Sequence, residues 1–155
     1  MLAILILLAA LAVQLRFDWL GELTSGGCKT SLCCEDCRSI RVTRIIDGDT
    51  FDSGEGRVRL YGVDAPERGE QCHAQATNRL SKLAGSSVRV QPGDRPTDPN
   101  GRRLFYVYTK QGESIAETLI REGLGRAWTR DGQHHDLLVQ LEKGAQRSRK
   151  GCLWR

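Results

Sequence analysis

The amino-acid sequence predicts an α+β domain, in which five short β-strands form a small barrel and helices pack against it. Three observations support this fold class. After residue 38, five short segments carry the apolar patterns of strands. Segments with helical spacing of apolar residues are interspersed among them, and turns rich in glycine and aspartate separate them. The chain has 155 residues, enough for one such domain and an N-terminal extension.

The first three predicted strands are joined by short turns. They cover Ser39 to Ile46, Thr50 to Ser53 and Arg57 to Val63. Apolar and polar residues alternate in the first and third, which is typical of strands with one buried face. Asp47-Gly48-Asp49 is predicted as the first turn, because Asp-Gly is a strong hairpin signal, and Gly54 to Gly56 as the second.

The remaining predicted elements alternate between helix and strand. Gly85 ends the first helix, and Gly123 followed by Leu124 predicts a Schellman ending for the second. We expect a long loop from Pro92 to Arg103, with three prolines and two glycines, and such loops are often functional. The first helix is expected from His73 to Ala84, and the two strands at Val88 and Val90 and from Leu104 to Thr109. The second helix contains Ile115, Leu119 and Ile120, and the last helix contains Leu137, Leu138, Leu141 and Ala145. Five strands with interspersed helices are typical of an oligonucleotide-binding (OB) barrel.

The N-terminus is predicted to be a targeting segment. Leu2 to Val13 is an unbroken apolar run of 12 residues, which matches a signal-peptide core and is short for a bilayer span. No Lys or Arg precedes the run, and its Ala10-Leu11-Ala12 pattern lies inside it, so cleavage stays open. We expect residues 1–20 to be a signal peptide or a membrane anchor through residues 2–20, and the protein to be exported, either secreted or periplasmic.

Residues 21–37 are rich in Gly, Ser and Cys and are expected to form a linker or a small stapled lobe. Disulfides persist in exported proteins, and six cysteines allow 15 pairings. We expect Cys72 to pair with Cys152, which leaves a small knot of the other four. A zinc site is the alternative for these four, which are Cys28, Cys33, Cys34 and Cys37.

Charge is unevenly distributed along the chain. Residues 1–37 carry a net charge of −2 and the whole chain +4, so residues 38–155 carry +6. A basic domain suits a polyanionic partner such as nucleic acid, although a soluble basic protein without such a partner has the same composition.

Three carboxylates stand close to the predicted turns. Asp47 and Asp49 flank Gly48, and Asp64 follows the third strand. Oxygen ligands without competing nitrogen or sulfur select a hard cation, Ca²⁺ or Mg²⁺. Hydrolysis of a phosphodiester needs such a cation, positive groups around the phosphate and a group that positions or deprotonates water.

The motifs IIDGDTF, RVRLYGVDAPE, DPNGRRLFYVY and GCLW together resemble the staphylococcal nuclease (thermonuclease) family in order, spacing and content. The resemblance covers about residues 39–154 and implies the family's five-stranded OB barrel with three helices for a domain at 38–155. It also implies a calcium-dependent nuclease that hydrolyses DNA or RNA with little sequence preference, as an endonuclease leaving 3′-phosphate ends.

The resemblance assigns a metal site. Asp49 and Asp64 match the family's calcium-binding carboxylates, and Asp47 matches an outer-shell or water-mediated partner. The backbone carbonyl of Ala65 supplies a further ligand, although the family often has Thr at this position.

The resemblance also assigns the groups that act on the phosphate. Arg59 and Arg102 match the two phosphate-binding arginines, and strand alternation places Arg59 on one face with Arg57 and Tyr61. Arg103 competes with Arg102, and the family spacing after glycine selects Arg102. Glu67 matches the proposed general base, which deprotonates or orients the attacking water.

Two departures from the family pattern leave substrate preference open. Pro99-Asn100 stands where the best-known member has Lys-Tyr, and the tyrosines of its nucleotide pocket have no clear counterpart, although Trp128 is near. Two alternatives belong to other functional classes than a nuclease. One is a non-catalytic OB-fold module that binds nucleic acid or protein, and the other is a redox or zinc protein centred on Cys28 to Cys37. Nothing in the sequence indicates a protein partner, and we expect a monomer.

Overall fold

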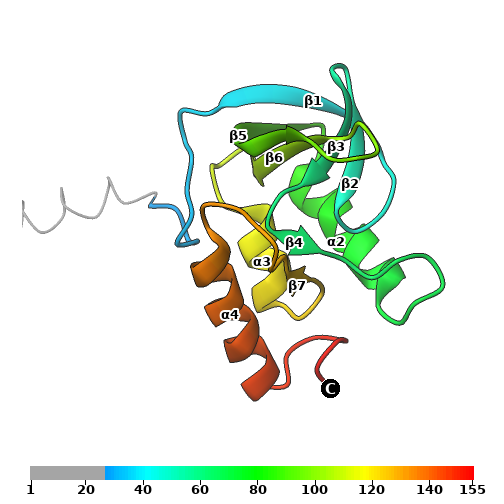
Figure 1. The fold of residues 1–155 in the computed structure, drawn as a ribbon, viewed down its shortest axis with the longest axis vertical. Helices are drawn as coiled ribbons and strands as arrows, with labels where there is room; N and C mark the ends of the chain where they lie inside the picture. The colour runs from blue at the N-terminus through cyan, green and yellow to red at the C-terminus, as the bar shows by residue number, and fades with distance from the viewer. Residues whose placement is uncertain (1–26) are drawn as a thin grey trace, which may run out of the picture.

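The structure, a computed structural model, describes residues 27–155 and confirms the predicted barrel with three helices (Figure 1). The targeting segment expected at residues 1–20 lies outside the described residues. Within residues 27–155, no helix has both the length and the apolar character that a bilayer span requires. The elements are β1 (Arg38–Ile45), β2 (Thr50–Ser53), β3 (Gly56–Leu60), β4 (Val63–Asp64), α2 (His73–Ala84), β5 (Ser87–Thr97), β6 (Arg103–Tyr108), α3 (Ile115–Arg121), β7 (Arg126–Ala127) and α4 (His135–Arg147).

Five strands close the barrel in the order β1-β2-β3-β6-β5. Neighbouring strands are antiparallel except β3 and β6, which are parallel. The inner face is apolar, with Phe51, Val58, Val88 and Val107 each at most 1% exposed. Because side chains alternate along a strand, the other face of β2 and β3 is left for polar residues.

The predicted third strand is wrong in its extent. The structure divides Arg57 to Val63 into β3 and β4, with a turn at Tyr61-Gly62 between them. Gly62 has a φ of 91°, and a Cβ there would lie 2.6 Å from a side-chain carbon of Leu138. Glycine meets both requirements, and the turn carries β4 out of the barrel to pair with β7.

The predicted loop from Pro92 to Arg103 is also wrong in its extent. β5 continues to Thr97, so the turn covers only residues 98–102. The β5–β6 register shifts between Pro92 and Thr97. Prolines are tolerated at such irregular positions, because no ladder hydrogen bond is lost there.

The helices cover the barrel with apolar faces. α2 buries Ala76, Leu80 and Ala84, which recur every four residues on one face. α3 ends in the predicted Schellman motif, in which Leu124 N donates to Leu119 O at 2.9 Å and Gly123 N to Ile120 O at 3.0 Å. α3 lies between the barrel and α4 in Figure 1.

Three disulfides stabilise the ends of the described chain. The predicted Cys72–Cys152 pair is confirmed, and the four clustered cysteines form Cys28–Cys33 and Cys34–Cys37. The described residues contain no free cysteine, so disulfides replace the zinc alternative.

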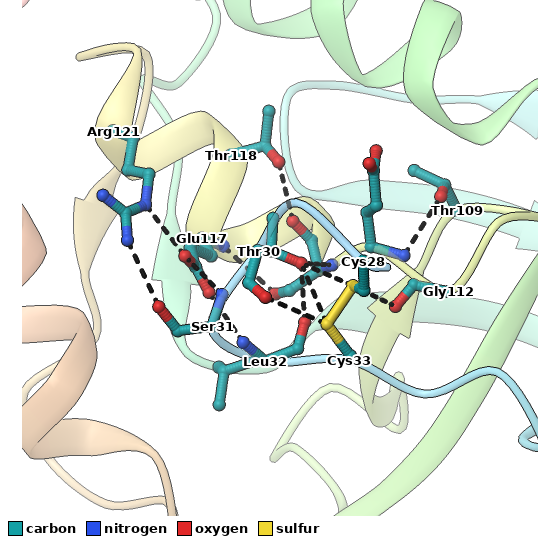
Figure 2. Close-up of a disulfide and its surroundings, with 12 residues drawn as sticks. Cys28, Thr30, Ser31, Leu32, Cys33, Thr109, Gly112, Glu117, Thr118 and Arg121 are labelled. Carbon is teal, nitrogen blue, oxygen red and sulfur yellow. Dashed lines mark hydrogen bonds and ion pairs between the residues drawn. A yellow bond between two sulfur atoms is a disulfide. The ribbon is translucent and has the colours of Figure 1, made fainter. Parts of the chain in front are cut away.

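The cysteine-rich segment is docked on the domain. Glu117, whose side chain is 0% exposed, accepts backbone hydrogen bonds from Ser31 and Leu32, both at 2.9 Å (Figure 2). Cys34 N donates to Gly112 O at 2.9 Å. Residues 28–37 therefore form a stapled lobe on the start of α3.

Candidate active site

The turn between β1 and β2 sets Asp49 against the end of β4. Asp47 accepts the N–H of Asp49 at 3.1 Å, which closes an Asx turn. A Cβ at Gly48 would lie 2.7 Å from the Cβ atoms of Ala65 and Ala76, so only glycine allows this close approach. The N–H of Ala65 then reaches Asp49 Oδ2 at 2.8 Å.

Arg59 bridges the two carboxylates that the sequence analysis assigned to a metal. Its Nη1 lies 2.6 Å from Asp49 Oδ1, and its Nη2 lies 2.5 Å from Asp64 Oδ1. Arg59 and Asp49 are buried, with side chains 8% and 3% exposed, whereas Asp64 is 51% exposed. Thr50, the β2 residue opposite Arg59, adds a hydrogen bond to Asp49 Oδ1 at 2.8 Å.

Burial governs the protonation of this cluster. Burial raises the pKa of Asp49 to about 6, against the lowering effects of Arg59 and the Ala65 N–H. Asp47 raises the pKa of Asp49 further by charge repulsion. Burial lowers the pKa of Arg59, but Asp49 and Asp64 outweigh it and hold that pKa above its ordinary value. Arg59 therefore stays charged, and Asp49 is a buried carboxylate that favours additional positive charge nearby.

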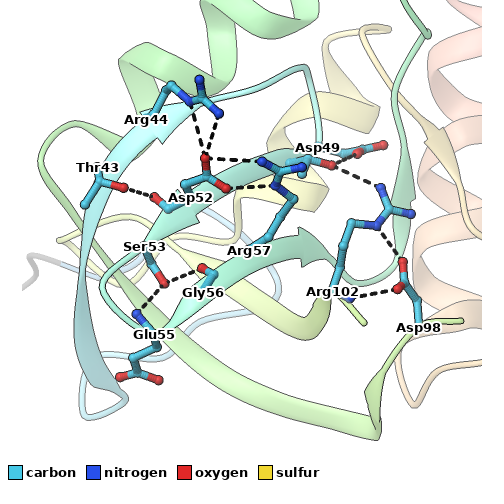
Figure 3. Close-up of polar contacts among 11 residues, drawn as sticks. Thr43, Arg44, Asp49, Asp52, Ser53, Glu55, Gly56, Arg57, Asp98 and Arg102 are labelled. Carbon is cyan, nitrogen blue, oxygen red and sulfur yellow. Dashed lines mark hydrogen bonds and ion pairs between the residues drawn. The ribbon is translucent and has the colours of Figure 1, made fainter. Parts of the chain in front are cut away.

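The 98–102 turn presents Arg102. Asp98 accepts the backbone N–H of Asn100 at 2.9 Å. It also accepts the backbone N–H of Arg102 at 2.9 Å and its Nε at 2.6 Å (Figure 3). Arg102 Nη1 lies 3.5 Å from Thr50 Oγ1, beside the Arg59 cluster. Asp98 escaped the sequence analysis, although an aspartate before Pro-Asn-Gly is a turn signal that locates such a capping residue.

Arg103 is directed away from Arg102. Its Nε donates to the carbonyl of Glu55 at 2.9 Å, on the β2–β3 hairpin. The structure thus distinguishes the two arginines and places Arg102, the residue selected from the sequence, at the Arg59 cluster.

Arg59, Asp64, Glu67 and Arg102 line one cavity of about 520 Å³. Glu67 is exposed and follows β4 on a short loop, where its N–H donates to Glu70 Oε2 at 2.9 Å. The structure thus brings together two carboxylates and two guanidinium groups from three separate segments of the chain.

Trp128 forms another wall of the cavity. The guanidinium carbons of Arg59 and Arg130 lie 5.6 and 4.9 Å from its ring centre. Its Nε1 donates to Asp131 at 2.7 Å, and Asp131 pairs with Arg95 at 2.6 Å. From the sequence, Trp128 is only a neighbour of the expected site. Arg95, Arg130 and Asp131 carry no signal there, because no local pattern links these residues to the motifs.

Asp47 and Ala65, the other two residues predicted to bind metal, lie beside Asp49 and make hydrogen bonds to it. Asp47 caps the turn, and Ala65 contributes its N–H, which leaves its carbonyl as a predicted ligand. Across residues 27–155, no three His, Cys, Asp or Glu side chains converge as a metal-binding group. Asp49 and Asp64 each pair instead with a terminal nitrogen of Arg59.

Comparison with known proteins places these features in a family. Residues 57–155 match the family model described as "Staphylococcal nuclease homologue". The chain belongs to the staphylococcal nuclease family. The match contains Arg59, Asp64, Glu67 and Arg102, while Asp47 and Asp49 lie just before it.

Individual relatives cover more of the chain. It is 33% identical over 155 aligned positions to a thermonuclease of Staphylococcus intermedius, covering 92% of this chain and 90% of the relative. It is 35% identical over 126 positions to a micrococcal nuclease of Shigella flexneri, covering 73% and 71%. An uncharacterized endonuclease of Escherichia coli O157:H7 is 31% identical over 126 positions, covering 78% and 79%.

Proposed function

We propose that this staphylococcal nuclease family member is a calcium-dependent endonuclease that cuts DNA or RNA with little sequence preference. The family and its relatives make the chain a nuclease that hydrolyses phosphodiester bonds. The observation that carries the finer proposal is the guanidinium of Arg59 held between Asp49 and Asp64, in a cavity also lined by Glu67 and Arg102.

Calcium fits the donor groups of this site. Asp49, Asp64 and the carbonyl of Ala65 offer oxygen only, which is the preference of a hard cation. Burial raises the pKa of Asp49 even beside Arg59, so a bound cation would stabilise the ionised carboxylate. When bound, the cation would supply Lewis-acid stabilisation of the phosphate.

The two arginines are suited to hold the phosphate. Arg59 carries five donor hydrogens, and its ion pairs with Asp49 and Asp64 use two of them. Asp98 fixes Arg102 through its Nε, and Nη1 has only a long contact of 3.5 Å with Thr50 Oγ1, so Nη2 is available to a phosphate oxygen. Planar guanidinium groups offer paired donors, and such donors stabilise the charge that develops on the phosphoryl oxygens.

Glu67 is placed to act on water. Its side chain is exposed at the cavity, so solvent reaches it without rearrangement of the fold. We assign it the role of accepting a proton from, or orienting, the attacking water. Water oxygen then bonds to phosphorus as the bond to the 5′ oxygen breaks. The leaving 5′ oxygen takes up a proton from solvent, so the products carry a 3′-phosphate and a 5′-hydroxyl.

We also propose that the enzyme cuts with little sequence preference and that it is exported. The charged groups of the cavity suit phosphate, and contacts to phosphate carry no base information. Three disulfides among residues 27–155 support an oxidising compartment, and with the apolar run at Leu2 to Val13 they support export to the periplasm or outside the cell.

The proposal is tested with the full chain, its disulfides intact. Cleavage of single- and double-stranded DNA and of RNA is measured with Ca²⁺, with Mg²⁺ and with chelator. We expect internal cutting with Ca²⁺, none with chelator, and 3′-phosphate ends. A folded protein that binds these nucleic acids but cuts none with any metal would support the non-catalytic OB-fold module instead.

A further inference from the structure

A second hollow adjoins the active-site cavity on the outer face of the barrel. It measures about 560 Å³ and is lined by Asp52, Arg57, Asn100, Gly101 and Arg102. Asn100 and Arg102 also line the cavity that holds Arg59 and Glu67. The two hollows therefore meet at the 98–102 turn, on either side of Arg102.

The strand register aligns the two hollows. In the β2–β3 ladder, Thr50 lies opposite Arg59 and Asp52 lies opposite Arg57. Residues two apart point to the same face and are about 6.6 Å apart along a strand. Arg57 thus lies two residues before Arg59 on the same face of β3, displaced along the strand from the active-site cavity.

Arg57 belongs to a row of charges across three strands. Asp52 accepts Arg57 Nε at 2.8 Å and Arg44 Nη2 at 3.0 Å, and Arg44 is its register partner on β1 (Figure 3). Two guanidinium groups share one carboxylate, so the row carries a net positive charge. The side chains of Arg44 and Arg57 are 67% and 47% exposed.

These exposed ion pairs are easily exchanged for another anion. Ion pairs open to solvent contribute little to stability, so a phosphate competes with Asp52 for Arg57 at small cost. A guanidinium binds phosphate oxygens with paired, charge-assisted hydrogen bonds. Neutral Asn100 and Gly101 at the rim of the hollow add no repelling charge.

We propose that the hollow at Arg57 is a second phosphate subsite, which binds the phosphate next to the scissile one on a polynucleotide strand. The inference rests on the proposed function, in which Arg59 and Arg102 hold the scissile phosphate. It assigns the enzyme a substrate class: strands that extend at least one nucleotide beyond the cleaved bond on the Arg57 side are preferred over dinucleotides.

The test compares a dinucleotide, which has a single phosphodiester, with a longer single-stranded oligonucleotide. In Arg57→Ala, the ratio of kcat/KM for the oligonucleotide to that for the dinucleotide is expected to fall about 3- to 10-fold, the loss of one exposed charged contact. The slope of log kcat/KM against log salt for the oligonucleotide should decrease in size by about 0.7. Asp52→Asn, which removes the competing carboxylate, should raise the ratio.

Arg41→Ala is the matched control, because Arg41 is an exposed β1 arginine that lines neither hollow. An unchanged ratio in Arg57→Ala, or an equal fall in Arg41→Ala, would overturn the subsite. Binding of the oligonucleotide in chelator separates this inference from the proposed function. If the wild type cuts nothing but Arg57→Ala binds about 3- to 10-fold more weakly, the subsite stands and the catalytic proposal fails.

Discussion

At the scale of single residues, the site depends on charges that compensate one another. Asp49 is a carboxylate with 3% of its side chain exposed, and Arg59 is its ion-pair partner at 2.6 Å. Removing one partner of a buried pair leaves an uncompensated charge, which costs about 3–5 kcal/mol. Substitutions that keep the charge therefore separate the chemistry of the guanidinium from the stability of the fold.

Arg59→Lys is the most informative such substitution. Lysine keeps the positive charge but lacks the planar fork that reaches Asp49, Asp64 and a phosphate together. We expect kcat to fall by about 100-fold or more, as for the loss of one oriented donor to a transition state. Steady-state cleavage of single-stranded DNA checks this, with Arg41→Lys as the exposed control. A rate within a few-fold of wild type would mean that charge alone is needed.

Part of the site could be predicted from motifs, and part could not. Asp49, Asp64, Arg59, Glu67 and Arg102 lie in local motifs, and the structure gathers them around one cavity except Asp49, which lies behind Arg59. The hydrogen bond from Trp128 to Asp131 and the ion pair of Asp131 with Arg95 depend on the packing of these segments in the folded chain. Such contacts are set by tertiary packing, which no local spacing encodes.

At the scale of elements, the errors in the prediction have conformational causes. Alternation continues through Arg57 to Val63, so nothing in the pattern shows that Gly62 adopts a φ of 91° and ends the strand. Pro96 falls within β5 because the β5–β6 register is irregular there. Helix limits were predicted better: His73–Ala84 is the extent of α2, since Gly85 follows directly.

Glu117 connects two elements that lie far apart in the sequence. It receives the N–H groups of Ser31 and Leu32 and the Nε of Arg121, which lies 2.8 Å away. Burial raises the pKa of Glu117, but these hydrogen bonds outweigh it and hold the pKa below its usual range. The ionised form therefore holds residues 28–37 on α3.

Glu117→Gln is expected to lower the free energy of unfolding by about 1–3 kcal/mol at pH 7, because one part-buried backbone N–H loses its charged acceptor. A depressed folded pKa gives stability that is present above the unfolded pKa of about 4.3 and is lost as pH falls through the folded value. The variant should lose this part of the acid dependence. Urea unfolding between pH 7 and pH 3 checks both effects.

Glu35→Gln is the control for this substitution, since Glu35 is exposed on the same lobe. Equal stability of Glu117→Gln and wild type across the whole pH range would show that ionised Glu117 does not hold residues 28–37 on α3.

At the scale of the whole molecule, the C-terminus is tied back to the start of α2. The Cys72–Cys152 disulfide closes a loop with a sequence separation of 80. Leu153 N donates to Gly123 O at 3.1 Å, and Arg126 lies 5.4 Å from the ring centre of Trp154. The disulfide therefore places every element from α2 to α4 in one covalent ring.

Replacing both Cys72 and Cys152 with serine should destabilise the protein by about 2–4 kcal/mol, because the long loop then adds entropy to the unfolded state. The paired control is Cys28→Ser with Cys33→Ser, whose sequence separation is only 5 and whose loop-closure effect is smaller. Thermal and urea unfolding of the two double variants give the comparison. A larger loss in the short-loop variant would show that docking of the lobe matters more than the covalent ring.

The central claim is that Glu67 acts on water at a site where Arg59 and Arg102 hold the phosphate. Single-turnover cleavage by Glu67→Gln, measured beside the affinity for single-stranded DNA, tests it most directly. We expect a cleavage rate at least about 100-fold below wild type, in the range of general-base catalysis, with the affinity for DNA changed less than about 3-fold. Cleavage at the wild-type rate would contradict the assignment of Glu67, and a loss of affinity equal to the loss of rate would make it a binding residue.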